Sequence, residues 1–88
     1  MASVYIPSLL RHITQGLSIV QVQGTTVRAV IDNLDLNYHG MKARLLDGNQ
    51  LRSDVSVAVD GQTATLGLSE IVKSDSEIHF IPAISGGF

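Results

Sequence analysis

The sequence predicts an α+β fold, a mixed sheet of four to five strands with one main helix packed on one of its faces. Three observations lead to this prediction. Short alternating runs of apolar and polar residues occur near both ends of the chain and in its second half, as in half-buried strands. One segment repeats apolar residues at helical spacing. The order strand, strand, helix, strand, short strand, strand favours a sheet with one buried and one open face.

The composition is that of a single folded domain. The chain has 88 residues, of which 44% are apolar and 16% charged, which argues against disorder. The net charge is −2 without a basic cluster, so no nucleic-acid partner is expected. The absence of cysteine excludes disulfides and thiolate metal sites. No apolar run approaches the ~20 residues of a membrane span, and no signal peptide is evident, so we expect a cytoplasmic protein without a membrane partner.

Two strands joined by a wide connection are predicted in the first third of the chain. Residues 3–6 alternate polar and apolar side chains before Pro7 closes the strand. Residues 8–16 are less regular and are interpreted as a connection with room for a helical turn. Residues 17–23 are rich in β-branched side chains, which favours a second strand. Its alternation lapses at Val20, which leaves its register open.

The main helix is predicted after a threonine cap. Either Thr25 or Thr26 can accept a hydrogen bond from a free amide in the first turn. Arg28 and Asp32 are four residues apart and can form a weak pair on the polar side. The helix is expected to end near Tyr38, before the glycine at position 40. The apolar face consists of Val27, Val30, Ile31 and Leu34.

The plainest strand of the sequence follows two short features. Residues 41–46 allow a second short helical turn, and residues 47–49 form a turn cluster. Residues 55–59 then alternate strictly between apolar and small residues. They end at Asp60 and Gly61, a dipeptide typical of tight turns.

The remaining part of the predicted domain is a loop between two extended segments. Residues 62–66 are interpreted as a returning arm or a short edge strand. Residues 67–75 are mostly loop, and residues 77–81 are the last strand. Three apolar side chains of the loop are expected to be pinned to the core: Leu68, Ile71 and Val72.

Alternation also sorts the strand side chains into two faces. Those expected to face the helix are Val4, Ile6, Val55, Val57, Val59, Ile78 and Phe80. On the opposite face, Tyr5, Ala58, His79 and Ile81 would form a small apolar patch if the first, middle and last strands are neighbours. Contiguous exposed apolar patches often mark protein contacts. We therefore predict that this patch docks a partner.

No constellation of residues indicates an enzyme active site. His12, His39 and His79 lack metal-ligand spacing, and His79 is interpreted as a surface or interface side chain. Asp32 and Asp35 fall on the polar side of the helix, which favours solvated carboxylates over a catalytic pair. We expect a protein that is not an enzyme and that binds no metal or cofactor itself.

Beyond the last strand the chain continues through a proline into Ser85, Gly86, Gly87 and Phe88. Adjacent glycines have no side chains and adopt many backbone conformations, so this segment can pass through a narrow channel in another protein. The alternative interpretation is a frayed terminus of no consequence. We predict a domain over residues 1–82 and a flexible Gly-Gly tail with one extra residue over residues 83–88.

Several segments together resemble the ubiquitin-like sulfur-carrier family, which includes the thiamine-biosynthesis carrier and the small subunit of molybdopterin synthase. They are VYIPSLLR (4–11), TVRAVI (26–31) with Tyr38, RLLD (44–47), VDG (59–61) and IPAISGG (81–87). The resemblance spans nearly the whole chain, and the first of these segments favours the cysteine-biosynthesis branch. It implies the ubiquitin-like β-grasp, whose element order is the one predicted above.

The resemblance also implies a chemistry for the tail. In this family an adenylating enzyme of the ubiquitin-activating type uses ATP to activate the terminal glycine. A sulfur donor then forms a thiocarboxylate, which supplies sulfur to an accepting enzyme such as a PLP-dependent cysteine synthase. Carried over to this chain, Gly87 is the adenylation and thiocarboxylate site, while Ser85 and Gly86 lie in the partner's channel. The carrier acts as substrate and sulfur donor for these enzymes.

Phe88 departs from the family pattern, in which the active form ends at Gly-Gly. An amide-linked Gly87 cannot act as the nucleophile, so Phe88 is expected to be removed first. The resemblance implies a JAB/MPN-type metalloprotease for this step. Three other functions remain open: a ubiquitin-like modifier joined to proteins through Gly87, a molybdopterin-synthase small subunit, and a binding module with an inert tail. The final sulfur acceptor is open as well.

Overall fold

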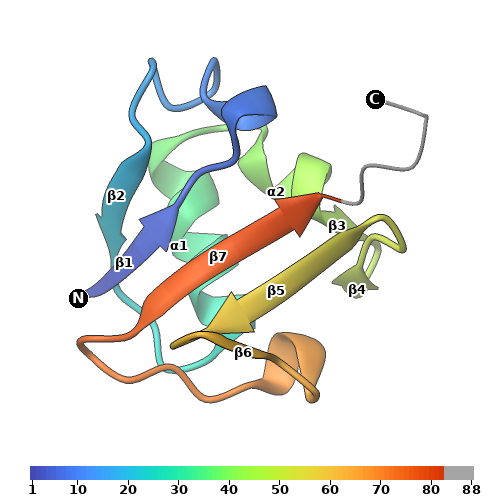
Figure 1. Ribbon diagram of the computed structural model, residues 1–88. Helices are drawn as coiled ribbons and strands as arrows, with labels where there is room; N and C mark the ends of the chain where they lie inside the picture. Colours follow the sequence, from blue (N-terminus) through green and yellow to red (C-terminus); the bar gives the residue numbers. More distant parts are fainter. Residues whose placement is uncertain (83–88) are drawn as a thin grey trace.

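The computed structural model describes residues 1–82, and residues 83–88 lie outside the described part. Five strands form one mixed sheet in the order β2-β1-β7-β5-β6, and helix α1 covers one of its faces (Figure 1). The elements are β1 (Ala2–Tyr5), β2 (Ile19–Val22), α1 (Val27–Asn37), β5 (Val55–Val59), β6 (Gln62–Thr63) and β7 (Glu77–Pro82). The predicted α+β class and ubiquitin-like β-grasp are confirmed.

β7, the last strand along the chain, lies at the centre of the sheet. It pairs in parallel with β1 on one side and antiparallel with β5 on the other. β2 and β6 extend the sheet as antiparallel partners of β1 and β5. The first, middle and last predicted strands are therefore neighbours, which is the condition that the predicted patch requires.

Smaller elements fill the connections between strands and helix. The wide first connection contains a 3-10 turn, η1 (Ser8–Leu10), and the loop before β7 contains another, η2 (Gly67–Ser69). The predicted second helical turn is α2 (Met41–Leu45). A hairpin of β3 (Leu46–Asp47) and β4 (Gln50–Leu51) forms a separate small sheet. The sequence indicated only a turn there, since strands of two residues cannot show alternation.

α1 begins at the predicted cap. The Thr26 hydroxyl accepts a hydrogen bond from the Ala29 amide at 3.1 Å, so the choice between the two threonines is settled. The four predicted apolar residues of α1 are buried against the sheet. α1 ends before Gly40, whose φ of 101° lies in the left-handed region that glycine tolerates best. The chain can therefore turn directly into α2.

Two carboxylates of α1 connect it to α2. The Asp35 carboxylate accepts hydrogen bonds from the amides of Gly40 and Lys42, at 3.2 and 3.0 Å. Asp32 pairs with the Lys42 ammonium at 2.7 Å, and Arg28 instead contacts Asn49 at 3.5 Å. Arg28 and Asp32 form no direct ion pair among residues 1–82, because α2 brings Lys42 to this carboxylate, and the Arg28 charge contributes only the smallest of the effects that lower the pKa of Asp32.

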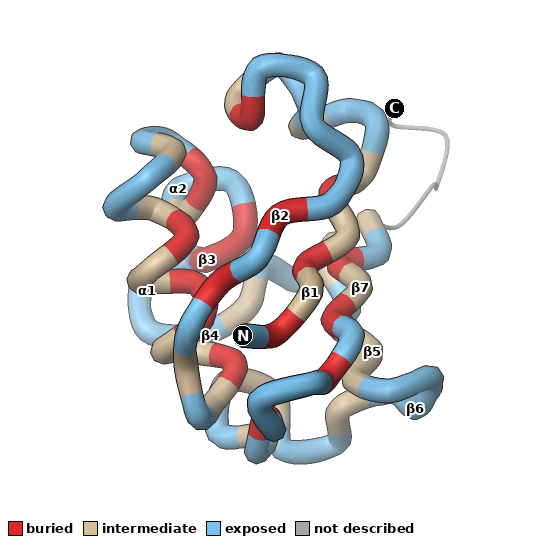
Figure 2. Tube along the Cα trace, turned by 90° about the vertical axis from the view of Figure 1, so that its left-hand side faces the viewer, coloured by how far each residue is buried: buried red, intermediate tan, exposed pale blue. Residues whose placement is uncertain are grey.

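The core lies between α1 and the sheet. Figure 2 shows buried and less buried positions alternating along β1, β2 and β7. In β2, Val20 and Val22 are buried while Ile19 is 45% exposed, which resolves the register left open by the sequence. The buried hydrophobic residues are Ala2, Val4, Ile6, Val20, Val22, Val27, Val30, Ile31, Leu34, Met41, Leu45, Leu46, Val57, Val72, Ile78 and Phe80.

The loop after β6 departs from its prediction at one residue. Val72 is buried and Leu68 packs against the core, as expected. Ile71 is 63% exposed, so its predicted place in the core was wrong. The reason is local geometry. Ile71 forms an isolated β-bridge with Thr26, and neighbouring side chains on extended backbone point to opposite sides. Only one of Ile71 and Val72 can face the core.

Candidate functional site

The predicted tail residues Ser85, Gly86, Gly87 and Phe88 lie outside the described residues. Their roles as channel segment, adenylation site and processed residue therefore stay predictions. The structure describes the root of this segment. β7 ends at Pro82, which pairs with Val55 at the start of β5. The site is therefore built from the sheet face that leads to this point.

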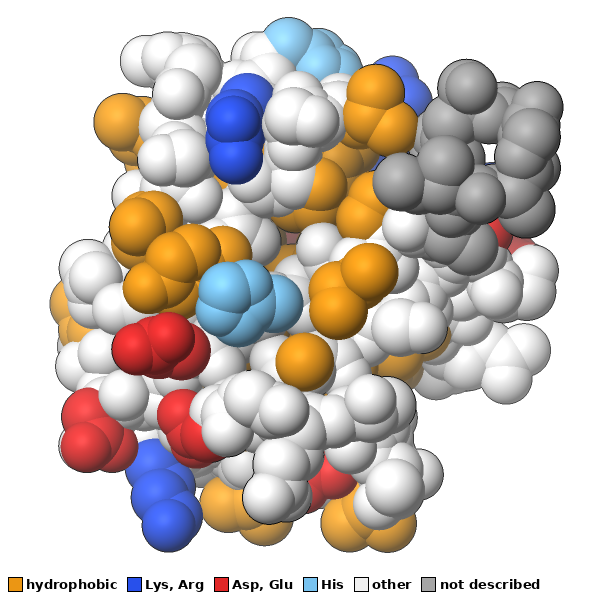
Figure 3. All heavy atoms as spheres, viewed as in Figure 1, with side chains coloured by type: hydrophobic (Ala, Val, Ile, Leu, Met, Phe, Trp, Pro, Cys, Tyr) orange, Lys and Arg blue, Asp and Glu red, His pale blue; other side chains and the backbone are white. Residues whose placement is uncertain are grey.

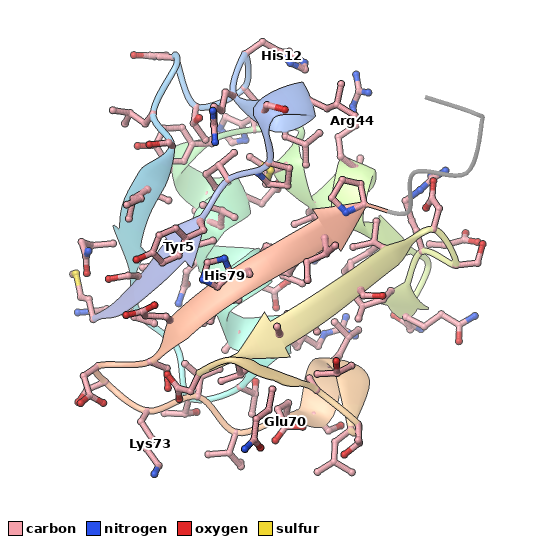
Figure 4. All side chains as sticks on the ribbon, viewed as in Figure 1. Tyr5, His12, Arg44, Glu70, Lys73 and His79 are labelled. Carbon is pink, nitrogen blue, oxygen red and sulfur yellow. The ribbon has the colours of Figure 1, made fainter. Side chains whose placement is uncertain are left out.

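The open face of the sheet carries the predicted patch. Tyr5 of β1 pairs with His79 of β7, and His79 pairs with Ala58 of β5. The rings of Tyr5 and His79 are stacked, with centroids 4.1 Å apart and planes 10° apart. Figure 4 shows these two side chains next to each other over the face that α1 does not cover. The sequence predicted that these three residues lie together. It did not predict that the rings of Tyr5 and His79 stack.

Ile81 extends the patch toward the end of β7. It lies two residues beyond His79 on the same strand, so both point to the open face, and it is 51% exposed. Figure 3 shows hydrophobic side chains around a histidine on this face. The structure thus brings Tyr5, Ala58, His79 and Ile81 together, and we call these four residues the docking patch. Their use in docking stays a prediction.

One further residue of the open face was missed by sequence reasoning. Ile19 of β2 pairs with Tyr5, so it lengthens the row of outward-facing residues across the sheet. The signal was present in residues 19–22, but the adjacent apolar residues Ile19 and Val20 break the alternation, so the sequence did not show which of them faces inward. A hollow of about 430 Å³ lies between this row and the segment after β1, with Pro7, Arg11, Ile19 and Ile81 in its lining. The Arg11 side chain is held there by a 3.0 Å hydrogen bond from Nε to the Ile6 carbonyl.

A carboxylate lies close to the stacked pair. Glu77 Oε1 is 3.9 Å from His79 Nε2, and both side chains are about half exposed. This contact places a carboxylate from the start of β7 at the edge of the docking patch.

The opposite end of β7 is fixed by Asp60, in the turn between β5 and β6. Its carboxylate accepts hydrogen bonds from the Ser76 hydroxyl and the Glu77 amide, each at 2.9 Å. Its own amide donates to the Glu77 carbonyl at 2.8 Å. The bonds from Glu77 and Ser76 lower the pKa of Asp60. The turn therefore ties the end of β5 to the start of β7 and sets how β7 lies in the sheet.

Residues 1–82 show neither a metal centre nor a membrane helix. Within this part of the chain, no three His, Cys, Asp or Glu side chains lie close enough together to bind a metal ion. No helix of the same residues has the length and apolar character to cross a bilayer.

Known sulfur carriers match this chain in sequence. The family model described as the ThiS family matches residues 4–87, a range that includes both glycines of the tail. The sulfur carrier protein CysO of Mycobacterium tuberculosis strain H37Rv is 32% identical over 90 residues, covering 97% of each chain. The CysO of Mycobacterium bovis matches to the same extent.

Solved structures match the fold closely, and the sequence matches settle the family. A chain in the crystal structure of the Amycolatopsis orientalis BexX/CysO complex has a TM-score of 0.94 at 32% identity, covering 99% of this chain and all of that chain. M. tuberculosis CysO has a TM-score of 0.88 at 30% identity, covering 96% and 100% of the two chains. The expected resemblance to the cysteine-type carriers is confirmed. The chain therefore belongs to the ThiS family and is a homologue of the sulfur carrier CysO.

Proposed function

We propose that this protein carries sulfur as a thiocarboxylate on Gly87. The observation that supports this most strongly is that the match to the ThiS family extends through residue 87. The 32% identity to CysO over 97% of both chains adds to it. In this role the chain is a substrate and sulfur donor for other enzymes, and Gly87 follows the last residue of the central strand, Pro82, by five residues.

The chemistry uses the carboxylate of Gly87 once Phe88 is gone. In an adenylating enzyme of the ubiquitin-activating type, a carboxylate oxygen attacks the α-phosphorus of ATP, and pyrophosphate leaves. The resulting acyl-adenylate is attacked at its carbonyl carbon by sulfide from a sulfur donor, and AMP leaves. The product is the thiocarboxylate. Cleavage of ATP to AMP and pyrophosphate thus drives formation of the thiocarboxylate. An accepting enzyme, such as a PLP-dependent cysteine synthase, can then take its sulfur.

Removal of Phe88 is the step that makes this chemistry available. While Phe88 is attached, the Gly87 carbonyl belongs to an amide and has no free oxygen to attack ATP. Hydrolysis of the Gly87–Phe88 bond by a metalloprotease of the JAB/MPN type would release the carboxylate. We propose that all these steps take place in the cytoplasm.

Docking to partner enzymes is assigned to the docking patch of Tyr5, Ala58, His79 and Ile81. In this patch Ile81 is exposed and the other three residues are half-buried, and the patch is adjacent to the root of the tail, so a partner bound there also has the tail within reach. The crystal structure of an A. orientalis BexX/CysO complex supports a carrier that works by binding a partner protein.

Intact-mass analysis tests the proposed function. The full chain and a chain ending at Gly87 are each incubated with ATP, sulfide and the cognate adenylating enzyme. We expect only the chain that ends at Gly87 to gain the mass of one sulfur in place of one oxygen. Thiocarboxylation with Phe88 retained would contradict the processing step. Isopeptide adducts on lysines of other proteins, without a thiocarboxylate, would indicate a protein modifier instead.

A further inference from the structure

A second surface borders the root of the tail, on the side of the sheet opposite the docking patch. Adjacent strand residues point to opposite faces, so Ile81 lies on the open face and Pro82 on the other side. Because β1 runs parallel to β7, the segment after β1 lies beside the end of β7. β5 is antiparallel to β7 and begins at the same place, where Val55 pairs with Pro82.

A pocket of about 380 Å³ lies between these segments. Its walls are apolar and its rim is charged. The apolar walls come from Leu9, Leu10, Val55 and Pro82, and the charged side chains are Arg44, Arg52 and Asp54. We call this cavity the tail-root pocket. Its residues come from four separate parts of the chain, so no local sequence pattern reveals it.

The rim of the tail-root pocket has more positive than negative charge. Arg52 uses its Nε to pair with Asp54 Oδ1 at 3.2 Å. Arg44 has no hydrogen-bond or ion-pair partner among residues 1–82. The pocket thus has two guanidinium groups and one carboxylate, which pairs with Arg52, in a chain whose net charge is −2. An Arg side chain presents several donors in a planar fork, which suits a carboxylate.

The charges are also separated along β7. Figure 4 shows Arg44 near the end of β7, whereas Glu70 lies at the opposite end of the molecule. Asp60 and Glu77 lie at that opposite end as well, because they flank the start of β7, and Figure 4 also shows Lys73 there. The three carboxylates outnumber this ammonium group, so a partner surface with negative charge is favoured at the tail end over the other end.

We propose that the tail-root pocket binds an acidic side chain of the adenylating enzyme, together with an apolar neighbour that packs on its walls. The inference rests on the proposed function, since the partner is the enzyme that activates Gly87. Arg44 and Arg52 bind the carboxylate, and Leu9 and Val55 contact the apolar side chain. The enzyme would then hold the carrier on both sides of β7. The five residues from the pocket to Gly87 span at most about 18 Å, so this contact restricts where the reactive end can lie.

Kinetics of adenylation test the contact. The substrate is the chain ending at Gly87, and ATP-dependent pyrophosphate release is measured against carrier concentration. We expect Arg44→Glu to raise KM about tenfold, an effect of one buried charged contact, with kcat nearly unchanged. Arg44→Gln should have a smaller effect in the same direction. The matched control is Arg28→Glu, which makes the same charge change on α1 outside the pocket and should leave KM within about twofold.

The outcomes separate the two proposals. An unchanged KM for Arg44→Glu, with normal adenylation of the chain that ends at Gly87 and retains Arg44, overturns the pocket contact and leaves the proposed function standing. A wild-type chain ending at Gly87 that is never adenylated overturns both. An equal rise in KM for Arg28→Glu indicates a general charge effect and also overturns the pocket contact.

The alternative occupant of the pocket is the chain's own segment 83–88, and NMR distinguishes it. Amide spectra of the free full-length protein are compared between wild type and Arg44→Glu. Under our proposal only signals of residues around Arg44 shift, which also shows that the variant is folded. Large shifts confined to residues 83–88 would identify the tail as the occupant and overturn the proposal.

Discussion

At the scale of single residues, Asp60 is the side chain on which the placement of β7 depends most. Its φ of 54° is unusual for a residue with a side chain and suits Asp and Asn better than other residues. From that position its carboxylate reaches both Ser76 and Glu77. The carboxylate therefore holds together a tight turn and the start of the central strand.

Replacing Asp60 with Asn is expected to lower the stability of the fold at neutral pH. The same change is expected to make this stability less dependent on pH. The folded state lowers the pKa of Asp60, so this group contributes stability above its unfolded pKa of about 3.9 and loses it as pH falls through the lower folded value. In urea unfolding, Asp60→Asn should lower the midpoint at neutral pH and reduce the loss of stability in acid. Asn retains the backbone preference, so the change reports the charge.

The control for this prediction is Asp75→Asn, since Asp75 makes no side-chain hydrogen bond or ion pair within residues 1–82. Its unfolding midpoint should match that of the wild type. A pH dependence for Asp60→Asn equal to that of the wild type would contradict the role given to this carboxylate.

A second prediction at this scale concerns Ile81 in the docking patch. Ile81→Thr keeps the β-branched shape that suits a strand but removes apolar contact area. We expect about fivefold weaker binding to the adenylating enzyme, which corresponds to about 1 kcal/mol, with little change in unfolding. Isothermal titration with the matched variant Ile71→Thr provides the control, because Ile71 is also exposed but lies in the loop before β7. Equal affinities for the two variants would rule out a docking role for Ile81.

At the scale of elements, α1 shows how far periodicity alone can predict structure. Its cap, its buried face and its end near Tyr38 were all predictable, because each depends on residues within a few positions of one another. The strands with strict alternation were predictable for the same reason. The short hairpin of β3 and β4 and the exposure of Ile71 were not, because they depend on which neighbours the fold supplies.

The stability of α1 can be tested with two leucines that lie two positions apart. Leu34 is fully buried, whereas Leu36 is 71% exposed. Leu34→Ala should reduce the free energy of unfolding by about 2–5 kcal/mol, since it leaves a cavity in the core. Leu36→Ala should change it by no more than about 0.5 kcal/mol. Chemical denaturation of both variants measures the difference, and similar losses would mean that α1 is not packed as described.

At the scale of the whole molecule, the candidate site was only partly predictable. The docking patch followed from alternation once β1, β5 and β7 were assumed to be neighbours, because side-chain direction is fixed by the strand period. The tail-root pocket was not predictable. Arg44 lies in α2 and Arg52 in the connection between β4 and β5, so their common position depends on how these segments pack. Contacts between distant segments of this kind are not encoded in any short pattern.

The central position of β7 also affects when the protein can fold during its synthesis. Ser3 at the start of the chain pairs with Glu77 near its end, so nearly the whole chain must exist before the sheet can close. Before that, β1 and β5 have no strand between them, and their apolar faces lack a complete core. Such long-range pairings form late and slowly. A nascent chain that is cut or stalled before residue 77 therefore cannot form the sheet. A chain can therefore fold only after β7 has been synthesised, and β7 directly precedes the segment that leads to Gly87.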